Sequence, residues 1–299
     1  MNKYSLSQKK QLISFYGIQR SGNHAVINWI CGMIKSPFFI NNLIPKKNIY
    51  KYHSPISLPK GIRFISKREG KNIIYLEKNK LSYKGGSKKN GPLIVSYENL
   101  IISSKTITDQ KDYLQNNIGF YKDKIDVILV RNPLNMMASQ INLISRYENK
   151  TDLYLNILKS MLKNLILKRE LYIRPKLALT INALRHYCYL WSIYSDCILK
   201  KQQFDNKTIY ILFEKWLLDK QYRENIATSL GLKNNDRNRR FVSDSGGGSS
   251  FEKNTSSNLN YYNLNSRYEN SPHKEIIYKI LKENPVAFYN WKKIYSLNS

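Results

Sequence analysis

Cysteine is scarce in this sequence, and long apolar runs are missing from it. The cysteines are Cys31, Cys188 and Cys197, an odd number without CxxC spacing, each inside an apolar stretch of helical character. This pattern supports neither a disulfide framework nor a zinc site and fits a reducing compartment. The first residues lack the apolar core of a signal peptide, and no later stretch is apolar for the roughly 18 residues of a membrane span. We therefore expect a soluble, cytoplasmic protein without a metal site.

Acidic residues are also few, because 21 Asp and Glu stand against 49 Lys and Arg, a formal net charge of +28. Such an excess favours an anionic partner: a nucleotide, a polyanionic glycan, nucleic acid or a membrane surface. The alternative is compositional, since Lys, Asn, Ile and Tyr are all frequent here, as codon bias in an AT-rich genome produces. Hydrophobic residues make up 42% of the 299 residues, enough for a sizeable core, and we expect one folded domain over residues 1–299.

Short apolar runs alternate with amphipathic stretches along the chain. The run 125–130 is nearly all apolar, as expected for a strand covered on both faces of a sheet. The repeated order of strand, loop and helix predicts an α/β fold with a parallel sheet and helices on both of its faces. The expected strands are 11–17, 62–66, 73–76, 93–97, 125–130 and 208–213, and the expected helices are 21–34, 133–146, 151–170, 181–200 and 222–230.

The segment 234–260 differs in composition, being charged at first and then rich in Gly and Ser, with little periodicity. On composition alone, this segment could equally be a linker or a loop of the main domain. Residues 261–299 are too few for a domain of their own, so we expect the segment to be a loop that folds over the main domain. The residues after it are expected to form a C-terminal helical segment.

The first candidate site is a loop between the first strand and the first helix. Gly17 and Gly22 have the Gly-x4-Gly spacing of a phosphate-binding loop, in which backbone N–H groups and the positive end of a helix dipole meet an anion. A loop for nucleoside triphosphates would continue with Lys and Ser or Thr, but Asn23 and His24 follow here. The cation lies inside the loop instead, as Arg20, and the usual magnesium ligand is missing.

The second candidate site follows the most apolar strand. Arg131, in an Arg-Asn-Pro string, is placed at the carboxyl edge of the predicted sheet, where open α/β sheets bind ligands. Ser139 comes eight residues later, in the second turn of a helix that begins at Pro133. Both side chains can then meet one phosphate. The alternative is an ordinary surface arginine and a helical serine.

These motifs together resemble the sulfotransferase superfamily, whose donor is 3′-phosphoadenosine 5′-phosphosulfate (PAPS). The string Arg-Ser-Gly at 20–22, and the strand ending in Arg-Asn-Pro with a serine eight residues after the arginine, look like the family's two donor motifs. Residues 209–214 and 222–232 are similar to its aromatic-Glu strand and its helix ending in Leu-Gly-Leu, and the Gly-Ser loop 246–251 stands where the family has a loop over the 3′-phosphate. The resemblance implies a three-layer, P-loop-like α/β fold, a central parallel sheet flanked by helices.

The same resemblance implies which residues bind the donor. The first loop would bind the 5′-phosphosulfate, and Arg131 with Ser139 would bind the 3′-phosphate, with the late loop closing over it. The implied set is Arg20, Ser21, Gly22, Asn23, His24, Ala25, Arg131, Ser139, Gly248, Ser249 and Ser250.

The chain departs from the family's pattern at three places. Arg20 stands where many members have Lys, and Asn23 with His24 where many have a Thr pair. Phe213 stands where many have a Tyr that touches the adenine. The late loop lacks the family's Arg-Lys-Gly string, which leaves Arg239 and Arg240 as alternatives to Ser249 and Ser250 at the 3′-phosphate.

Sulfuryl transfer needs a group that takes the proton of the acceptor hydroxyl as it attacks sulfur. Glu98 stands in a position similar to the family's base, and His53 is the alternative. Arg20 would neutralise charge on the bridging oxygen as the S–O bond breaks. His24 is expected to contribute its backbone N–H, and His186, on a Tyr- and Trp-rich helix, is expected to lie in the core.

The resemblance thus implies an enzyme, a PAPS-dependent sulfotransferase that releases adenosine 3′,5′-bisphosphate (PAP), needs no metal and sulfates a hydroxyl. The positive charge favours a carbohydrate acceptor. A P-loop kinase-like phosphotransferase is one alternative, but such an enzyme needs Lys after the second Gly and an acidic metal ligand at a strand end. This chain has Asn23 and Arg131 at those places. A nucleic-acid-binding protein is another, but no basic helix or aromatic-basic patch stands out, so no specific nucleic-acid partner is expected. The oligomeric state is not indicated.

Overall fold

A computed structural model gives the structure of the chain. It describes residues 11–34, 37–40, 42–43, 63–64, 74–77, 80–83, 92–118, 123–148, 181–204, 206–236 and 266–295. The chain divides into two compact units, Met1–Arg131 with Asp196–Tyr261, and Asn132–Ser195 with Tyr262–Ser299. That the chain is a single domain stays a prediction.

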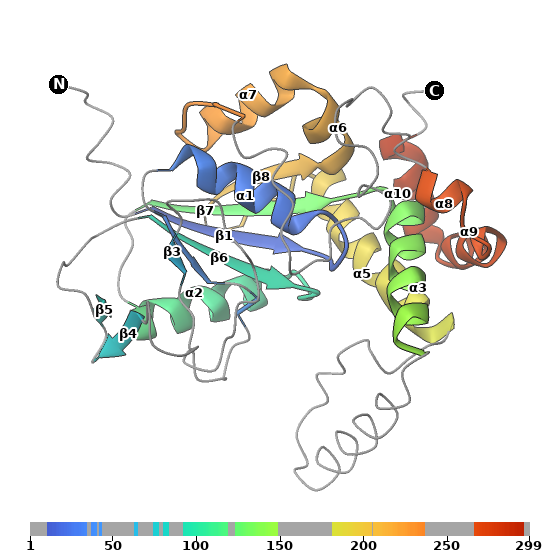
Figure 1. Ribbon diagram of the computed structural model, residues 1–299, viewed down its shortest axis with the longest axis horizontal. Coiled ribbons are helices and arrows are strands. Elements are labelled where there is room, and N and C mark those ends of the chain that lie inside the picture. Colours follow the sequence, from blue (N-terminus) through green and yellow to red (C-terminus); the bar gives the residue numbers. More distant parts are fainter. Residues whose placement is uncertain are drawn as a thin grey trace, which may run out of the picture. The chain divides into compact units, whose positions relative to one another are not determined.

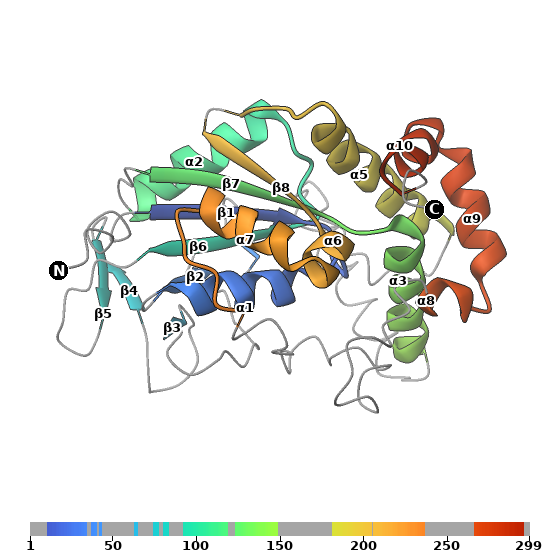
Figure 2. The ribbon, with the colours of Figure 1, turned by 90° about the horizontal axis from the view of Figure 1, so that it is seen from above.

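The first unit is built on a parallel sheet in which six strands are described, in the spatial order β3-β2-β6-β1-β7-β8. Figure 2 shows β8, β7, β1, β6 and β2 side by side in that order. Each neighbouring pair is parallel. The chain adds β2, β3 and β6 on one side of β1 and then β7 and β8 on the other, so the switch point at which such sheets bind ligands lies at β1. The strands are β1 (Gln11–Gly17), β2 (Phe38–Ile40), β3 (Arg63–Phe64), β6 (Leu93–Glu98), β7 (Asp123–Val130) and β8 (Lys207–Leu212).

Helices α1 (Asn23–Met33), α6 (Phe213–Leu218) and α7 (Lys220–Ser229) cover one face of this sheet, the α1 face. Figure 1 shows α1 and α7 on one side of the strands and α2 (Ser104–Ile118) on the other. Because side chains alternate along a strand, every second residue of β1, β6, β7 and β8 points to the α1 face. The buried side chains of these strands on that face include Ile13, Phe15, Ile94, Val127, Leu129 and Ile211.

The opposite face of the sheet, the α2 face, carries a mixture of apolar and polar side chains. Tyr16 and Tyr97 stack there with ring centroids 5.0 Å apart. Lys111 of α2 reaches Asp126 of β7, with Nζ and Oδ2 3.3 Å apart, and both side chains are buried. The centre of the α1 face is apolar, whereas the α2 face contains a buried ion pair.

The second unit is helical in its described residues. It contains α3 (Pro133–Glu148), α8 (Ser266–Glu269), α9 (Lys274–Glu283), α10 (Pro285–Tyr295) and most of α5 (Ile181–Leu199). Side chains join its helices: Asn290 Nδ2 donates to Ser195 Oγ at 3.0 Å, and Arg185 pairs with Glu283 at 2.8 Å.

The predicted α/β fold, a parallel sheet flanked by helices, is confirmed. Two strand predictions are corrected. The stretch 73–76 belongs to β4 (Ile74–Glu77), which pairs with β5 (Lys80–Tyr83) in a separate antiparallel sheet, and Phe213 begins α6 instead of ending β8. The three-residue β2 was not predicted. The expected helix at 151–170 and the loop from 237 onward lie outside the described residues.

The prediction for His186 is wrong, because this side chain is exposed. The buried stripe of α5 runs through Leu184, Cys188 and Trp191, three to four residues apart. His186 stands two residues from the first two of these, and a helix turns about 100° per residue, so it points away from the stripe.

Candidate functional site

Four neighbouring strands of the first unit end at the same edge of the sheet. In the parallel order β6-β1-β7-β8, the strands end at Glu98, Gly17, Val130 and Leu212. The residues that follow them are therefore close together, at the edge where open α/β sheets bind ligands. This edge gathers the glycine-spaced loop, Glu98, Arg131 and the start of α6, and Figure 1 shows the loop running from the tip of β1 into α1.

The glycine-spaced loop is closed from within by Asn23, the first residue of α1. Its Nδ2 donates to the carbonyl of Ile18 at 3.1 Å and to Glu98 Oε1 at 3.2 Å. The amide takes up the space beside Gly17, where a Cβ would lie 2.0 Å from Asn23 Oδ1. Gly17 is required by this close approach, and Asn23, where a triphosphate-binding loop has Lys, is buried and fixes the loop.

Gly22 is required for a different reason. Its φ is +90°, a left-handed conformation, and an added Cβ would lie 2.2 Å from the ring of Phe213. Arg20 also has a positive φ, of 71°. Successive residues of opposite handedness turn backbone N–H groups toward one side, and the N–H groups of Asn23 and His24, the first two residues of α1, have no carbonyl partner inside the helix. The loop thus has the backbone geometry of an anion-binding loop.

Other loop residues are held by backbone hydrogen bonds. Ser21 is fully buried and its N–H donates to the Ile18 carbonyl at 3.1 Å. The N–H of Ala25 donates to the Gly22 carbonyl at 3.0 Å, within the first turn of α1. The roles predicted for Ser21 and Ala25 at the donor stay predictions.

Arg131 joins the loop to the end of β8. Its Nη1 donates to the backbone carbonyl of Arg20 at 3.3 Å, and its guanidinium lies 4.7 Å from the centre of the Phe213 ring. Its Nε lies 4.0 Å from Glu214 Oε1. Arg131 directly follows β7 and is only 8% exposed, so it is not an ordinary surface arginine. Its role at the donor stays a prediction.

Glu98 and His24 face each other across the loop. His24 Nε2 lies 3.9 Å from Glu98 Oε1. Burial, together with the charge of Arg20, lowers the pKa of His24, while Glu98 acts in the opposite direction. The imidazole is therefore neutral at pH 7. Glu98 is the last residue of β6, and its contact with Asn23 places it at the loop. Its role as the base stays a prediction.

Two asparagines that sequence analysis missed support this edge. Asn99 accepts a hydrogen bond from the N–H of Gln19 at 2.8 Å, and its own N–H donates to the Gly17 carbonyl at 3.1 Å. Asn42 Oδ1 accepts from the N–H of Glu98 at 3.2 Å. Both have a positive φ, which asparagine tolerates better than most residues. A single asparagine outside a turn motif gives no signal in the sequence.

Ser139 lies in the second unit, in α3 as predicted, and is 6% exposed. Its Oγ accepts a hydrogen bond from Arg267 Nη1 at 3.4 Å. Its predicted pairing with Arg131 of the first unit stays a prediction. The alternative base His53, and Gly248, Ser249, Ser250, Arg239 and Arg240, lie outside the described residues.

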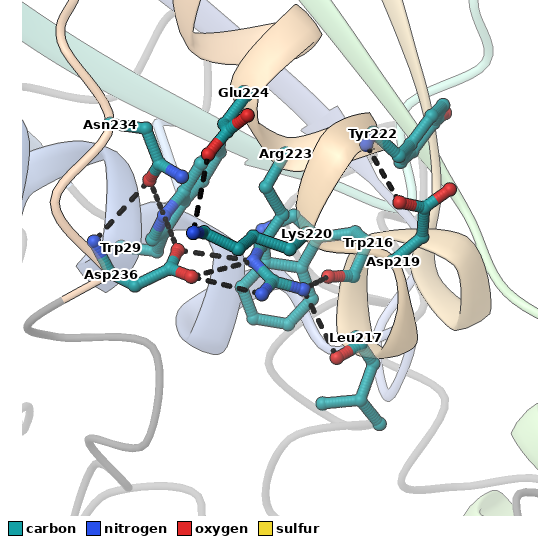
Figure 3. A network of polar contacts seen from close by, with 10 residues as sticks. All are labelled: Trp29, Trp216, Leu217, Asp219, Lys220, Tyr222, Arg223, Glu224, Asn234 and Asp236. Carbon is teal, nitrogen blue, oxygen red and sulfur yellow. Dashed lines mark hydrogen bonds and ion pairs between the residues drawn. The ribbon is translucent and has the colours of Figure 1, made fainter.

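A polar network anchors the last described residues after α7 against α1 (Figure 3). Asp236 accepts from Trp29 Nε1 at 3.0 Å and from Arg223 Nε and Nη2 at 3.0 and 2.9 Å. Arg223 also donates to the Trp216 carbonyl at 2.8 Å. Residue 236 therefore has a fixed position beside α1, within the segment that the sequence predicts to fold over the main domain.

Neither a metal cluster nor a membrane-spanning helix is present among the described residues. They contain no group of three or more His, Cys, Asp or Glu placed to hold a metal ion. No helix among them is long and apolar enough to cross a membrane. Cys31, Cys188 and Cys197 are buried free thiols.

Comparison with known proteins gives one structural likeness. No protein-family model and no curated protein matches the sequence. The structure is similar to a sulfotransferase domain from the curacin biosynthetic pathway, at 14% sequence identity and a TM-score of 0.31, over 64% of this chain and 61% of that one. The chain thus spans less than two thirds of that domain's length.

Proposed function

We propose that this chain is a sulfotransferase that transfers a sulfuryl group from PAPS to a hydroxyl, with a carbohydrate as the first candidate acceptor. One observation carries the proposal: the ends of β6, β1 and β7 bring Glu98, Arg20 and Arg131 to one edge of the sheet. These are the residues in which the sequence resembles a sulfotransferase. The contacts from Arg131 to the Arg20 carbonyl and from Asn23 to Glu98 join all three to one loop.

The chemistry follows from the residues of this edge. The N–H groups of Asn23 and His24 at the start of α1 bind the 5′-phosphosulfate, and Arg20 balances negative charge on the bridging oxygen. The acceptor oxygen forms a bond to sulfur as the bond from sulfur to the bridging oxygen breaks, and PAP leaves. Glu98 takes the proton of the acceptor hydroxyl.

No metal takes part in this step. Asn23 occupies the position of the lysine of a triphosphate-binding loop and holds the loop closed. His24 stands at the position of the hydroxyl that would bind Mg²⁺, and its neutral imidazole faces Glu98. A chelator is therefore expected to leave the activity unchanged, and loss of activity in EDTA that is restored by magnesium would contradict this part of the proposal.

Ligand-dependent thermal unfolding tests the proposed donor. PAP, ATP with magnesium and a DNA duplex are added in parallel, and PAP is expected to raise the melting temperature most. A ligand at 100 times its Kd adds about 2.7 kcal/mol to the free energy of unfolding. An equal or larger effect of ATP with magnesium would favour a phosphotransferase, and an effect of DNA alone would favour a nucleic-acid-binding protein.

The variant Arg131→Ala tests whether this response arises at the proposed edge. PAP binding should weaken by about 2 kcal/mol, the usual contribution of a charge-assisted hydrogen bond. Arg185→Ala is the matched control, because Arg185 is exposed and pairs with Glu283 in the second unit. Unchanged PAP affinity in Arg131→Ala would remove this arginine from the site.

The base is tested with Glu98→Gln, which keeps an oxygen to accept from Asn23 and loses the charge. Donor affinity should be retained while turnover falls by about 10² to 10⁴. His53→Ala is measured beside it, with labelled PAPS and a panel of carbohydrate, lipid and small alcohol acceptors. Normal turnover in Glu98→Gln with loss in His53→Ala would move the base to His53.

A further inference from the structure

Helices α9 and α10 of the second unit carry aromatic side chains with lysines placed over their rings. In three pairs the lysine follows the aromatic residue by four positions, so both side chains lie on one side of the helix. The pairs, with the distance from the lysine Nζ to the ring centre, are Tyr278 and Lys282 at 4.6 Å, Phe288 and Lys292 at 4.5 Å, and Tyr289 and Lys293 at 5.3 Å. A cation at such a distance is attracted to the ring, so each ammonium group is held beside an apolar surface.

The rings join the two helices into one surface. Tyr278 of α9 meets Phe288 and Trp291 of α10 edge to face, with ring centroids 6.2 and 6.1 Å apart. Figure 2 shows α9 and α10 as neighbours, both drawn in red. Val286 and Tyr289, three residues apart on α10, are 51% and 58% exposed and extend the apolar area. We call these side chains, with the three lysines, the aromatic-lysine surface.

The aromatic-lysine surface is positively charged. α10 contains Lys292 and Lys293 and neither Asp nor Glu. Of the two acidic residues in α9, Glu283 is paired with Arg185 at 2.8 Å. Exposed apolar groups and lysines therefore lie next to each other, and the matching partner is one that offers an apolar layer beside an anionic layer.

The ring faces distinguish between the anionic partners that composition leaves open. A nucleic-acid base stacks on an open ring face, but a lysine lies over one face of each of Tyr278, Phe288 and Tyr289. A membrane surface requires no open ring face, because tyrosine and tryptophan enter the headgroup layer and the apolar stems of lysines lie in the same layer. The exposed Val286 adds nothing to a stacking site but gains from burial among acyl chains.

We propose that the aromatic-lysine surface binds a membrane surface that contains anionic lipids. The rings lie at the level of the headgroups, and the lysines meet lipid phosphate and carboxylate groups. Binding of this kind is peripheral and requires no membrane-spanning helix. The inference goes beyond the proposed sulfotransferase activity and does not depend on it.

Cosedimentation of the full chain with lipid vesicles tests the proposal. We expect binding to phosphatidylcholine vesicles with about one third phosphatidylserine, and binding about tenfold weaker or less to phosphatidylcholine alone. Val286→Ser with Tyr289→Ser removes exposed apolar groups, and Lys282→Gln with Lys293→Gln removes two cations. Each double variant should weaken binding to the mixed vesicles by about tenfold or more. Absence of binding by wild type would overturn the proposal.

Matched controls in the first unit separate this surface from the overall charge of the chain. Lys207→Gln with Lys233→Gln removes two charges from exposed positions, and Leu218→Ser removes a side chain that is 60% exposed. Both should change binding by less than about twofold, although net charge attracts a protein to any anionic surface. Losses equal to those of Lys282→Gln with Lys293→Gln would overturn the proposal in favour of general adsorption. Circular dichroism shows that each variant is folded, and the apolar and the charge variants test the surface independently.

Trp291 reports directly on entry of the rings into the membrane. The other three tryptophans, Trp29, Trp191 and Trp216, are fully buried, whereas Trp291 is half-buried. Mixed vesicles that contain brominated phosphatidylcholine should quench part of the tryptophan fluorescence, and Trp291→Phe should abolish this quenching. Binding without quenching, or quenching that persists in Trp291→Phe, would overturn the proposed orientation and the proposal with it.

Heparin and a DNA duplex are measured beside the vesicles with the same variants. Binding of either polyanion that the aromatic-lysine variants weaken, without binding to vesicles, would overturn the proposal and assign the surface to a polyanion. PAP affinity is measured separately, because these outcomes do not bear on the sulfotransferase proposal.

Discussion

The two faces of the parallel sheet are both covered by helices, but different interactions hold them. On the α1 face, aromatic and aliphatic side chains pack together, and Trp29 of α1 meets Trp216 of α6 edge to face with ring centroids 5.9 Å apart. On the α2 face, the buried pair of Lys111 and Asp126 lies near the stacked tyrosines Tyr16 and Tyr97. Removing apolar atoms lowers stability in proportion to the buried apolar area that is lost. A buried charge, by contrast, strongly destabilises the fold once its partner is removed.

The apolar α1 face, and not the α2 face, supports the candidate site. The glycine-spaced loop leads into α1, and its Gly22 packs against Phe213, which belongs to the apolar core. The loop therefore depends on the shape of the α1 face. The α2 face contributes stability that depends on charge and on pH, and its ion pair is not part of the candidate site.

The largest effect is expected for Lys111→Met, which leaves Asp126 buried without its cation. Breaking a buried ion pair by removing one partner costs about 3–5 kcal/mol of unfolding free energy. Urea unfolding measures this loss. The double variant Lys111→Met with Asp126→Leu should recover most of it, because no buried charge remains. A loss below about 1 kcal/mol in the single variant would show that water screens this pair.

Gly22→Ala is the next largest and acts on the α1 face. The new methyl would meet the Phe213 ring, and the positive φ strains any residue with a Cβ. We expect a loss of about 2 kcal/mol or more in stability, together with weaker PAP binding. Gly231→Ala is the control, since that glycine has a similar φ of +70° but nothing within 4 Å of an added Cβ. Equal losses in both variants would mean that the ring contact has no effect.

Much of this arrangement could be predicted from the sequence because it is local. The strand, loop and helix around Gly17 and Gly22 are contiguous, and a buried apolar strand places Arg131 at the carboxyl edge of a parallel sheet. The contacts that complete the site are not local. Asn23 meets Glu98 75 residues away, and Phe213 packs on Gly22 through the register of β1, β7 and β8.

Three other features could not be predicted from the sequence, each for a physical reason. β2 has three residues, too few for a recognisable alternation. Tyr189 lies beside His186 on the exposed side of α5, and this aromatic neighbour gives the exposed side of the helix an apolar character in the sequence. The pair of Lys111 and Asp126 was missed because a charge in an apolar strand and a lysine in a polar helix give no sign that they meet.

Tyr97 makes the α2 face sensitive to alkaline pH. Burial, and then the charges of Asp126 and Tyr113, raise the pKa of Tyr97 well above its usual value, while Ser14 acts in the opposite direction. The folded state therefore favours the neutral phenol. Its contribution to stability is complete below about pH 10, where the unfolded tyrosine ionises, and is lost as the pH rises above that value, by about 1.4 kcal/mol per pH unit.

Tyr97→Phe should flatten this alkaline decline in stability, measured by urea unfolding from pH 8 to pH 11. The α1 face also contains a group whose pKa burial raises, the thiol of Cys31, and this thiol ionises within the measured pH range only in the unfolded chain, so Cys31→Ala is measured in parallel. A decline that persists in Tyr97→Phe and disappears in Cys31→Ala would assign the pH dependence to the α1 face.

The smallest effect is expected for Ile13→Val on the α1 face. Ile13 is fully buried among aliphatic and aromatic side chains, so the variant loses one methylene and leaves a small cavity. Unfolding free energy should fall by about 1 kcal/mol, the usual cost of this change. No titratable group is altered, so the loss should be the same at pH 8 and pH 10. A loss that grows with pH would show that packing around Ile13 is coupled to a titrating group, and repeating the measurement in Cys31→Ala would then decide whether that group is Cys31 on this face or lies on the α2 face.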